Sequence, residues 1–147
     1  MKKILMVLLI TMYGIATLSA QEWMTNFAEA QKIAHDENKK VLLLFAGSDW
    51  CAPCIKLERF ILDTEDFKEF VHAQYILVKA DFPRKKKNQL STETAKQNKM
   101  LADTYNPQGH FPLLLMLTAT GEKLGEVGYK KVAPSVYIDI LRSWEAR

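Results

Sequence analysis

The sequence predicts an α/β domain in which helices cover both faces of a mixed β-sheet. Two apolar runs, 41–45 and 75–80, have strand length and are separated by a helical pattern. Strands joined through a helix pair in parallel, because a parallel connection needs a long crossover. Two further runs, 113–117 and 123–127, flank the turn 118–121 and predict an antiparallel hairpin at the sheet edge. The chain has 147 residues, of which 48% are apolar and 25% charged, and this composition suits one globular domain with its own core.

The first half of the domain starts with an additional N-terminal helix. Thr25 and Asn26 are good N-cap residues, and apolar or small side chains recur after them at helical spacing up to about residue 38. The unbroken apolar run 41–45 predicts a strand that is buried on both faces. A second helical stripe follows the cysteines and includes Ile55, Leu57, Phe60, Ile61 and Leu62. Residues 64–70 extend or restart this helix before the strand 75–80.

The second half contains a polar, basic loop at 84–91 and a helix over 92–105, with Ala95, Met100 and Leu101 facing inward. Asn106-Pro107-Gln108-Gly109 is a turn sequence. After the hairpin, the last helix begins near Pro134 and Ser135, since proline is tolerated in a first helical turn. Its inward stripe is predicted to include Val136, Ile140 and Leu141. The predicted order of elements is therefore α β α β α β β α.

Residues 1–20 have the pattern of a secretory signal peptide. Met1-Lys2-Lys3 is a positive n-region, an uncharged apolar stretch runs to Leu18, and Ser19-Ala20 precedes the polar residues Gln21 and Glu22. The apolar stretch has about 15 residues, fewer than the ~20 that span a bilayer, so a retained membrane anchor is the alternative reading. We therefore expect a signal peptide at 1–20, a mature domain at 21–147, and export to a periplasmic location.

The charge of the mature chain gives no support for nucleic-acid binding. Without residues 1–20 the chain carries 18 Lys and Arg against 17 Asp and Glu, so it is close to neutral. The one basic run, Arg84-Lys85-Lys86-Lys87, lies in the predicted loop. Its first interpretation is a solvated surface insertion, and the alternative is an element that docks a protein partner.

The chain has two cysteines, Cys51 and Cys54, and they are separated by two residues. A structural disulfide is one explanation, because an exported protein meets an oxidising compartment. However, closing a loop of four residues stabilises a fold by only ~2 kcal/mol, against ~3 kcal/mol for fifteen residues. Two cysteines are too few for a four-thiolate zinc site, and a copper site would also need a converging histidine. The spacing therefore favours redox chemistry without a metal or cofactor.

The position of the pair, between a strand and a helix, gives the two thiols different roles. Cys51 lies at the start of the helix, where backbone N–H groups and the helix dipole favour its thiolate, so we predict that it attacks the substrate. Cys54 lies one turn further and is expected to be more buried, as suits the thiol that resolves a mixed disulfide. Pro53 fits the first helical turn. The intervening Ala52 and Pro53 tune the balance between thiolate and disulfide.

Asp49-Trp50-Cys51-Ala52-Pro53-Cys54, placed after an apolar strand, resembles the active site of the thioredoxin superfamily and especially its exported thioredoxin-like members. The resemblance runs from Val41 to the last helix. It implies a thioredoxin-like fold with a cis-proline loop facing the cysteines, and the matching residue is Pro112. Phe111 and Pro112 would then bind an extended substrate segment by strand addition. Trp50 is expected to be partly exposed beside the sulfur and to shape substrate contact.

Two positions depart from the thioredoxin pattern. A buried aspartate six residues before the first cysteine helps to move the proton of the second cysteine in that family, but Phe45 stands here. Leu77 lies near the position of the lysine that pairs with it, with Lys79 two residues on. Proton transfer at Cys54 must then use water, Asp49 or another group, although Asp49 also reads as a solvated helix cap. His110 lies close in sequence to the proline loop, as a neighbour of the dithiol or as an ordinary loop residue.

The sequence predicts a thiol:disulfide oxidoreductase that acts outside the cytoplasm. Strong oxidases and isomerases of this family commonly have histidine directly before the second cysteine, whereas this chain has Pro53. This favours a reductase of exported proteins, which would draw electrons from a membrane-bound donor. The alternatives are a disulfide oxidase or isomerase, and a non-catalytic module that binds peptides and keeps a permanent disulfide.

Overall fold

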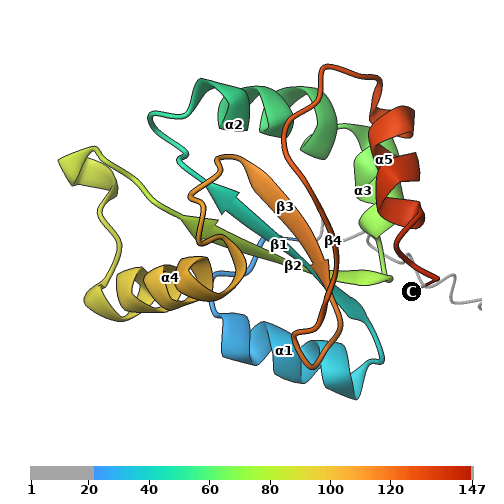
Figure 1. The fold of residues 1–147 in the computed structure, drawn as a ribbon, viewed down its shortest axis with the longest axis horizontal. Coiled ribbons are helices and arrows are strands. Elements are labelled where there is room, and N and C mark those ends of the chain that lie inside the picture. The colour runs from blue at the N-terminus through green and yellow to red at the C-terminus, as the bar shows by residue number, and fades with distance from the viewer. Residues whose placement is uncertain (1–21, 147) are drawn as a thin grey trace, which may run out of the picture.

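The structure, a computed structural model, describes residues 22–146, and in them a four-stranded sheet lies between two layers of helices (Figure 1). The strands are β1 (Lys40–Ala46), β2 (Tyr75–Asp81), β3 (Leu113–Leu117) and β4 (Lys123–Val127), in the order β2-β1-β3-β4. β1 runs parallel to β2 and antiparallel to β3, and β3 pairs antiparallel with β4. The predicted α/β fold with a central mixed sheet is confirmed. The predicted signal peptide at 1–20 lies outside the described residues.

The helices divide between the two faces of the sheet. One face is covered by α1 (Phe27–Asp36) and α4 (Thr92–Tyr105). The other face is covered by α2 (Ala52–Leu57), a π-helical turn η1 (Glu58–Leu62), α3 (Glu65–Val71) and α5 (Pro134–Arg142). Side chains of β1 alternate between the two cores, with Leu42 and Leu44 on the α2 side and Leu43 and Phe45 on the α1 side. As predicted, this strand is buried on both faces.

Side-chain caps explain where the helices begin. Asn26 accepts a hydrogen bond from the Glu29 amide at 3.1 Å and caps α1, as its residue type predicted. Thr64 accepts from the Phe67 amide at 3.4 Å, so the segment after the cysteines restarts as a separate helix, α3. A short 3₁₀ turn, η2 (Lys86–Asn88), lies in the basic loop. No helix among residues 22–146 is both long enough and apolar enough to span a membrane.

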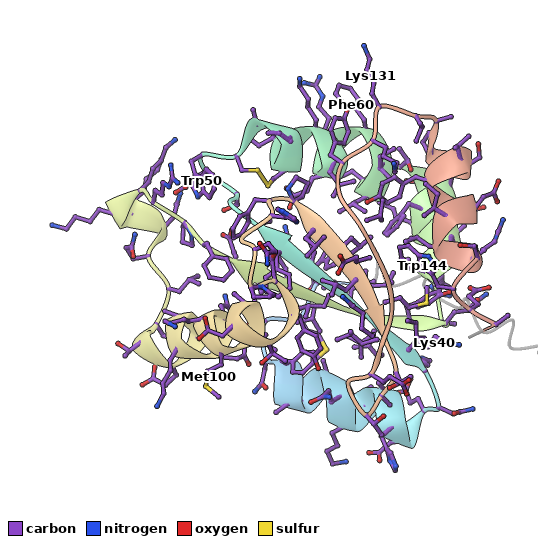
Figure 2. All side chains as sticks on the ribbon, in the orientation of Figure 1. Lys40, Trp50, Phe60, Met100, Lys131 and Trp144 are labelled. Carbon is purple, nitrogen blue, oxygen red and sulfur yellow. A yellow bond between two sulfur atoms is a disulfide. The ribbon has the colours of Figure 1, made fainter. Side chains whose placement is uncertain are left out.

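The predicted inward faces of the helices were partly wrong. Ile55 and Phe60 after the cysteines are about half exposed, and Met100 of α4 is 60% exposed (Figure 2). Val136 of α5 also faces solvent, and Ala95 of α4 does so as well. Each helix contacts the sheet along one narrow stripe, which in α5 consists of Tyr137, Ile138 and Leu141 and in α4 of Asn98 and Leu101. Apolar residues outside that stripe remain exposed whatever their hydropathy.

The direction of β3 brings two distant segments together. Although α4 separates it from β2 in the sequence, β3 runs antiparallel to β1, and Leu113 pairs with Phe45. The end of β1 and the beginning of β3 therefore lie side by side at the same end of the sheet. The cysteine turn leaves β1 there, and Phe111-Pro112 enters β3 there. Trp144, after α5, is buried and packs against Gly125 in the middle of β4.

Candidate active site

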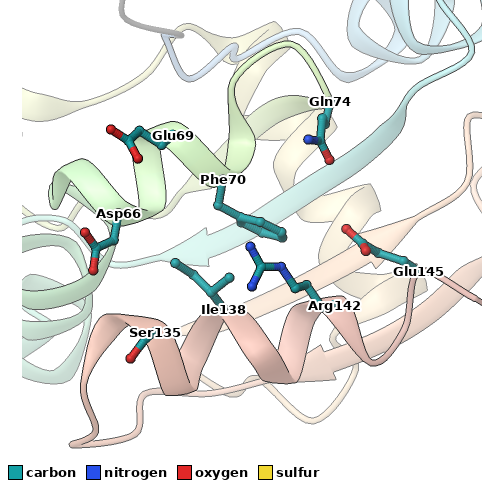
Figure 3. A pocket seen from close by; sticks show the side chains of 8 residues that line it. All are labelled: Asp66, Glu69, Phe70, Gln74, Ser135, Ile138, Arg142 and Glu145. Carbon is teal, nitrogen blue, oxygen red and sulfur yellow. The ribbon is translucent and has the colours of Figure 1, made fainter.

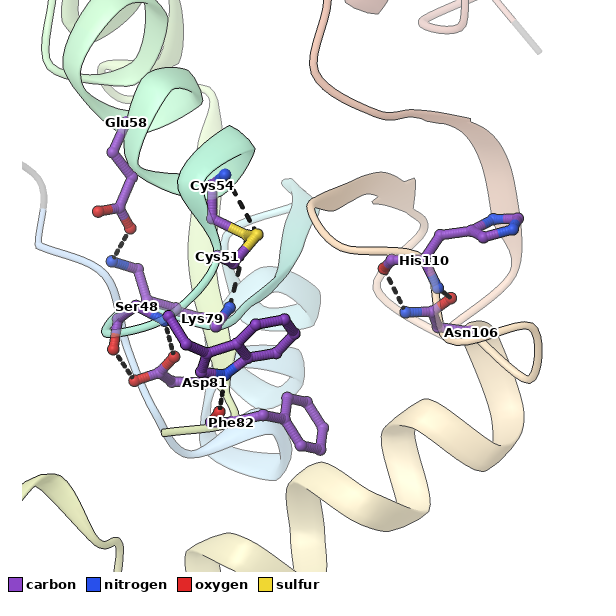
Figure 4. The surroundings of a disulfide bond; sticks show 11 residues. Ser48, Cys51, Cys54, Glu58, Lys79, Asp81, Phe82, Asn106 and His110 are labelled. Atoms are coloured by element: carbon purple, nitrogen blue, oxygen red, sulfur yellow. Dashed lines mark hydrogen bonds and ion pairs between the residues drawn. A yellow bond between two sulfur atoms is a disulfide. The ribbon is translucent and has the colours of Figure 1, made fainter. Parts of the chain in front are cut away.

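A tight turn at the end of β1 positions the two cysteines. The amides of Trp50 and Cys51 both donate to the Gly47 carbonyl oxygen, at 3.2 and 2.9 Å. Cys51 is the N-cap of α2, and Pro53 lies in the first helical turn, where its missing N–H is not needed. Cys51 and Cys54 are joined by a disulfide, with their Cα atoms 5.2 Å apart (Figure 4). The site is thus described in its oxidised form.

Each sulfur faces a backbone N–H group. The Cys54 amide donates to Cys51 Sγ at 3.3 Å, and the Gly47 amide lies 3.5 Å from Cys54 Sγ. Such donors stabilise a thiolate more than a thiol once the pair is reduced. Cys51 is 4% exposed and Cys54 1%, whereas Ala52 and Pro53 between them are exposed. Both cysteines are therefore buried, and Cys51 is slightly the more exposed residue, in the order the sequence predicted.

Trp50 forms one wall beside the disulfide. Its indole Nε1 donates to the Phe82 carbonyl oxygen at 2.7 Å, and its ring meets the edge of the Phe111 ring at 5.6 Å between centroids. The Arg84 guanidinium lies over the Trp50 ring, with Cζ 3.7 Å from the ring centroid. Trp50 is half-buried, and Gly47 leaves the space that its indole occupies. The predicted aromatic beside the sulfur is present, but the loop 82–84 holds it in place.

Asp49 faces that loop. Its carboxylate accepts hydrogen bonds from the Arg84 and Lys85 amides and from the Asn88 side chain, each at 2.9 Å. The Arg84 amide, followed by the Asn88 amide group, lowers the pKa of Asp49 from 3.8 to about 2. A carboxylate with so low a pKa is a very weak base. This geometry makes Asp49 an anchor for the basic loop and a poor acceptor for the Cys54 proton.

A polar network that the sequence did not reveal braces the same turn. Asp81, the last residue of β2, accepts from the Ser48 amide at 2.9 Å and from the Ser48 hydroxyl at 2.5 Å. The buried Asn98 side chain of α4 donates to the Asp81 carbonyl oxygen at 2.9 Å. The parallel register pairs Ala46 with Asp81, so the position of Asp81 next to the turn follows from the pairing of the two strands. The sequence predicted that β1 and β2 pair in parallel, but it did not indicate that Asp81 would accept hydrogen bonds from Ser48.

The loop before β3 contains the predicted substrate-binding residues. The Phe111–Pro112 peptide bond is cis. The buried Asn106 braces this loop, donating to the His110 carbonyl oxygen at 2.8 Å and accepting from the His110 amide at 2.9 Å. His110 is exposed, and its imidazole points away from the disulfide (Figure 4). Among residues 22–146, no three His, Cys, Asp or Glu side chains converge as metal ligands.

The charged groups near Cys54 differ from the thioredoxin pattern, as the sequence indicated. Phe45 and Leu77 are both buried. Lys79 of β2 instead pairs with Glu58, which lies one helical turn after Cys54 (Figure 4). This ion pair joins β2 to η1, the turn that follows α2.

A cavity of about 410 Å³ lies away from the cysteines between α3 and α5 (Figure 3). The guanidinium of Arg142 lies over the Phe70 ring at 5.4 Å, and Asp66, Glu69 and Glu145 line the edge. It contains no cysteine and no nucleophile paired with a base, so it lacks the chemistry of the dithiol site.

The fold and the dithiol define a thiol:disulfide oxidoreductase. At one end of the sheet, a CxxC pair lies at the start of a helix, opposite a loop with a cis-proline. This is the arrangement of the thioredoxin superfamily. The profile described as thioredoxin-like matches residues 22–119, and the chain belongs to this thioredoxin-like family.

Two curated relatives come from Chlamydia pneumoniae. The chain is 33% identical to its disulfide bond reductase DsbH over 118 residues, which are 80% of this chain and 69% of the relative. It is 22% identical to the thioredoxin-related protein DsbJ over 134 residues, 86% of this chain but only 37% of DsbJ.

Solved structures agree with this assignment. A DsbH oxidoreductase superposes with a TM-score of 0.79 and 31% identity, covering 86% of this chain and 85% of the other. A thioredoxin from Thermus thermophilus superposes with a TM-score of 0.64 and 16% identity, covering 85% and 87%. The second match supports the fold alone.

Proposed function

We propose that the protein reduces disulfides of exported proteins through the Cys51/Cys54 dithiol. The observation that carries this proposal is the WCAPC site, in which Pro53 and not histidine precedes the second cysteine. A histidine there would add a donor that stabilises the thiolate and would make the disulfide more oxidising. The relation to DsbH, a disulfide bond reductase, supports the same direction of electron flow.

In the proposed reaction the Cys51 thiolate attacks one sulfur of a substrate disulfide. The substrate S–S bond breaks, the leaving sulfur departs as a thiolate and takes a proton from water, and Cys51 is left in a mixed disulfide. Cys54 then loses its proton and attacks Cys51 Sγ, which releases the second substrate sulfur. Two electrons and two protons pass to the substrate, and the product is the Cys51–Cys54 disulfide, the form that the structure describes.

The rest of the proposed site binds and orients the substrate. Phe111 and Pro112 lie at the sheet edge beside the turn and offer backbone to an extended substrate segment. Trp50, Ala52 and Pro53 form the surface around the attacking sulfur. Asp49 acts on this surface indirectly, through the basic loop.

The proposed setting is outside the cytoplasm. The pattern of residues 1–20 supports export to the periplasm with a domain at 21–147. The proposed partners are exported proteins that carry disulfides or thiols, together with a membrane-bound donor that returns the Cys51–Cys54 disulfide to the dithiol. A nucleic-acid partner is not part of the proposal.

A Cys54→Ala variant, expressed as the full chain in its own host, tests the proposal. Without the resolving thiol, mixed disulfides between Cys51 and exported proteins should accumulate and disappear on treatment with a reductant. The Cys51→Ala/Cys54→Ala double variant is the control and should form none. If the single variant captures no exported protein, the catalytic proposal is wrong and the permanent-disulfide alternative is favoured.

The reduction potential decides the direction. We expect a value between those of thioredoxin and glutaredoxins, roughly −270 to −200 mV. A value near that of the oxidase DsbA, about −120 mV, would contradict the reductase and favour the alternative of a disulfide oxidase.

A further inference from the structure

A cavity of about 520 Å³ lies between Trp50 and the loop 84–90, and neither cysteine is among the residues that line it. Trp50, Phe82 and Phe111 form its inner wall, and Leu90 and Ala95 lie on the far side. Trp50 directly precedes Cys51, and Phe111 directly precedes Pro112. A side chain that enters this cavity therefore belongs to a segment passing close to the attacking sulfur.

The inner wall is aromatic. Phe82 and Phe111 meet edge to face at 5.4 Å, and Trp50 and Phe111 do so at 5.6 Å. The polar groups deeper in the cavity already have partners, since Asn98 donates to the Asp81 carbonyl oxygen and the Asp81 carboxylate is held by Ser48. The cavity thus offers apolar ring surface and a volume within the usual range of ligand sites, which suits an aromatic side chain.

The rim of the cavity is basic. Arg84 lines the cavity, and Lys85, Lys86 and Lys87 follow it in the exposed loop; we call these four residues the rim. None of them forms a direct ion pair with a residue among 22–146. Of the acids nearby, Asp49 turns its carboxylate to the loop backbone, and Asp81, which lines the cavity, has its carboxylate hydrogen-bonded to Ser48. This leaves an excess of positive charge at the mouth, which complements acidic groups on a partner.

We propose that this cavity is a specificity pocket for an aromatic side chain close to the reacting half-cystine, in a substrate segment whose flanking residues are acidic. The proposal rests on the proposed disulfide exchange at Cys51 and names the substrate class of that site. The inner wall takes the ring, and the Arg84–Lys87 rim takes the flanking carboxylates. The basic loop is then a substrate-binding element and not a neutral insertion.

Four synthetic peptides test the pocket with the full-length, pre-reduced protein. Each contains one cysteine in a mixed disulfide with 5-thio-2-nitrobenzoate, with Phe or Ala next to the cysteine and Glu or Lys in the flanks. Attack of Cys51 on the peptide sulfur breaks the S–S bond and releases the coloured 5-thio-2-nitrobenzoate thiolate. The rate at which this colour appears gives a second-order rate constant for each peptide. We expect the Phe/Glu peptide to react about tenfold faster than Ala/Glu. It should also react about tenfold faster than Phe/Lys at low salt, an advantage that shrinks as ionic strength rises.

Substitutions at the cavity and at its rim connect the preference to the structure. Ala95→Trp fills the cavity from the exposed surface of α4 and should reduce the Phe preference to within about twofold. Ala28→Trp, on an exposed site of α1, is the matched control and should keep the preference. Lys86→Glu should remove the Glu preference, whereas Lys32→Glu on α1 should not.

The outcomes separate the pocket from the chemistry. Equal rates for all four peptides with the wild-type chain would overturn the pocket, while the release of the coloured thiolate would leave the attack by Cys51 intact. No release from any peptide would contradict the proposed function itself. The wild-type comparison and the Lys86→Glu variant decide the question even if Ala95→Trp does not fold. A Phe preference that survives a folded Ala95→Trp would also overturn the pocket.

Discussion

Gly47→Ala should disturb the active site through a single methyl group. A Cβ at Gly47 would lie 2.3 Å from Trp50 Cε2 and 2.5 Å from Nε1, distances that no real contact reaches. The backbone of Gly47 is outside the left-handed region, so the position needs glycine for space alone. Because the indole lies against the backbone of the turn, we expect Trp50 to move outward in the variant.

The size of the effect follows from the contacts that Trp50 makes. The indole would lose its hydrogen bond to the Phe82 carbonyl oxygen, about 0.5–1.5 kcal/mol, and its ring contact with Phe111, about 0.5–1.5 kcal/mol. The sum, about 1–3 kcal/mol, agrees with the usual cost of overpacking. We therefore expect the free energy of unfolding of the oxidised protein to fall by about 1–3 kcal/mol. The rate of disulfide reduction should fall at the same time, since Trp50 lies beside Cys51.

Urea unfolding and the peptide-disulfide assay measure the two effects separately. Gly125→Ala is the matched control, because its Cβ would lie 2.2 Å from Trp144 Cδ2, in a contact that involves no active-site residue. It should lose similar stability but keep the wild-type rate. Gly128→Ala, whose nearest contact is the Pro112 carbonyl oxygen at 3.5 Å, should be nearly neutral in stability. The reasoning is refuted if Gly47→Ala is as stable and active as the wild type, or if Gly125→Ala loses the same activity.

Three further predictions concern the redox balance, the loop anchor and the helix register. Pro53→His should raise the reduction potential by about 30 mV, which equals about 1.4 kcal/mol of extra thiolate stabilisation. Equilibration with glutathione measures this potential, and an unchanged value would show that residue 53 does not control it. The pKa of Asp49 is lowered from 3.8 to about 2, so its hold on the loop should be complete above pH 3.8 and lost as the pH falls through about 2. Amide exchange of Lys85 should report this transition, and Asp49→Asn should lack it. In urea unfolding, Met100→Lys should change the free energy of unfolding by less than about 0.5 kcal/mol, whereas Leu101→Ala should lower it by about 2–5 kcal/mol. A larger loss for Met100→Lys than for Leu101→Ala would contradict the register of α4.

The fold was predictable from the sequence because its strongest signals are local. The apolar run at β1 is long enough for a buried strand and too short for a helix, and the turn at 118–121 brings β3 and β4 together. The inward faces of the helices were less predictable. Apolar residues such as Met100 and Phe60 fit a helical stripe, but the sheet contacts only part of each helix surface. One of the two buried residues of α4 is Asn98, which a hydropathy pattern excludes.

The two sulfur positions were also predictable, since the spacing of Cys51 and Cys54 and the strand before them are visible in the sequence. Their surroundings were not. Asp49 was interpreted as a cap or a proton acceptor, because only its neighbours in sequence could be considered. Its partners, Arg84 and Lys85, lie 35 and 36 positions away. Contacts over such distances depend on the strand pairing and on loop conformation, which composition does not specify.

These contacts link three features that looked independent in the sequence. The Asp49 carboxylate fixes the backbone of the basic loop, the Phe82 carbonyl oxygen fixes the Trp50 indole, and the Arg84 guanidinium covers that indole from outside. Each contact joins the turn that carries Cys51 to the segment after β2. A shorter loop would remove the Arg84 contact and the partners of Asp49 together, and would leave Trp50 held by Phe82 and Phe111 alone. The basic loop is therefore part of the structure that orients the surface around Cys51, although it contributes no reactive group.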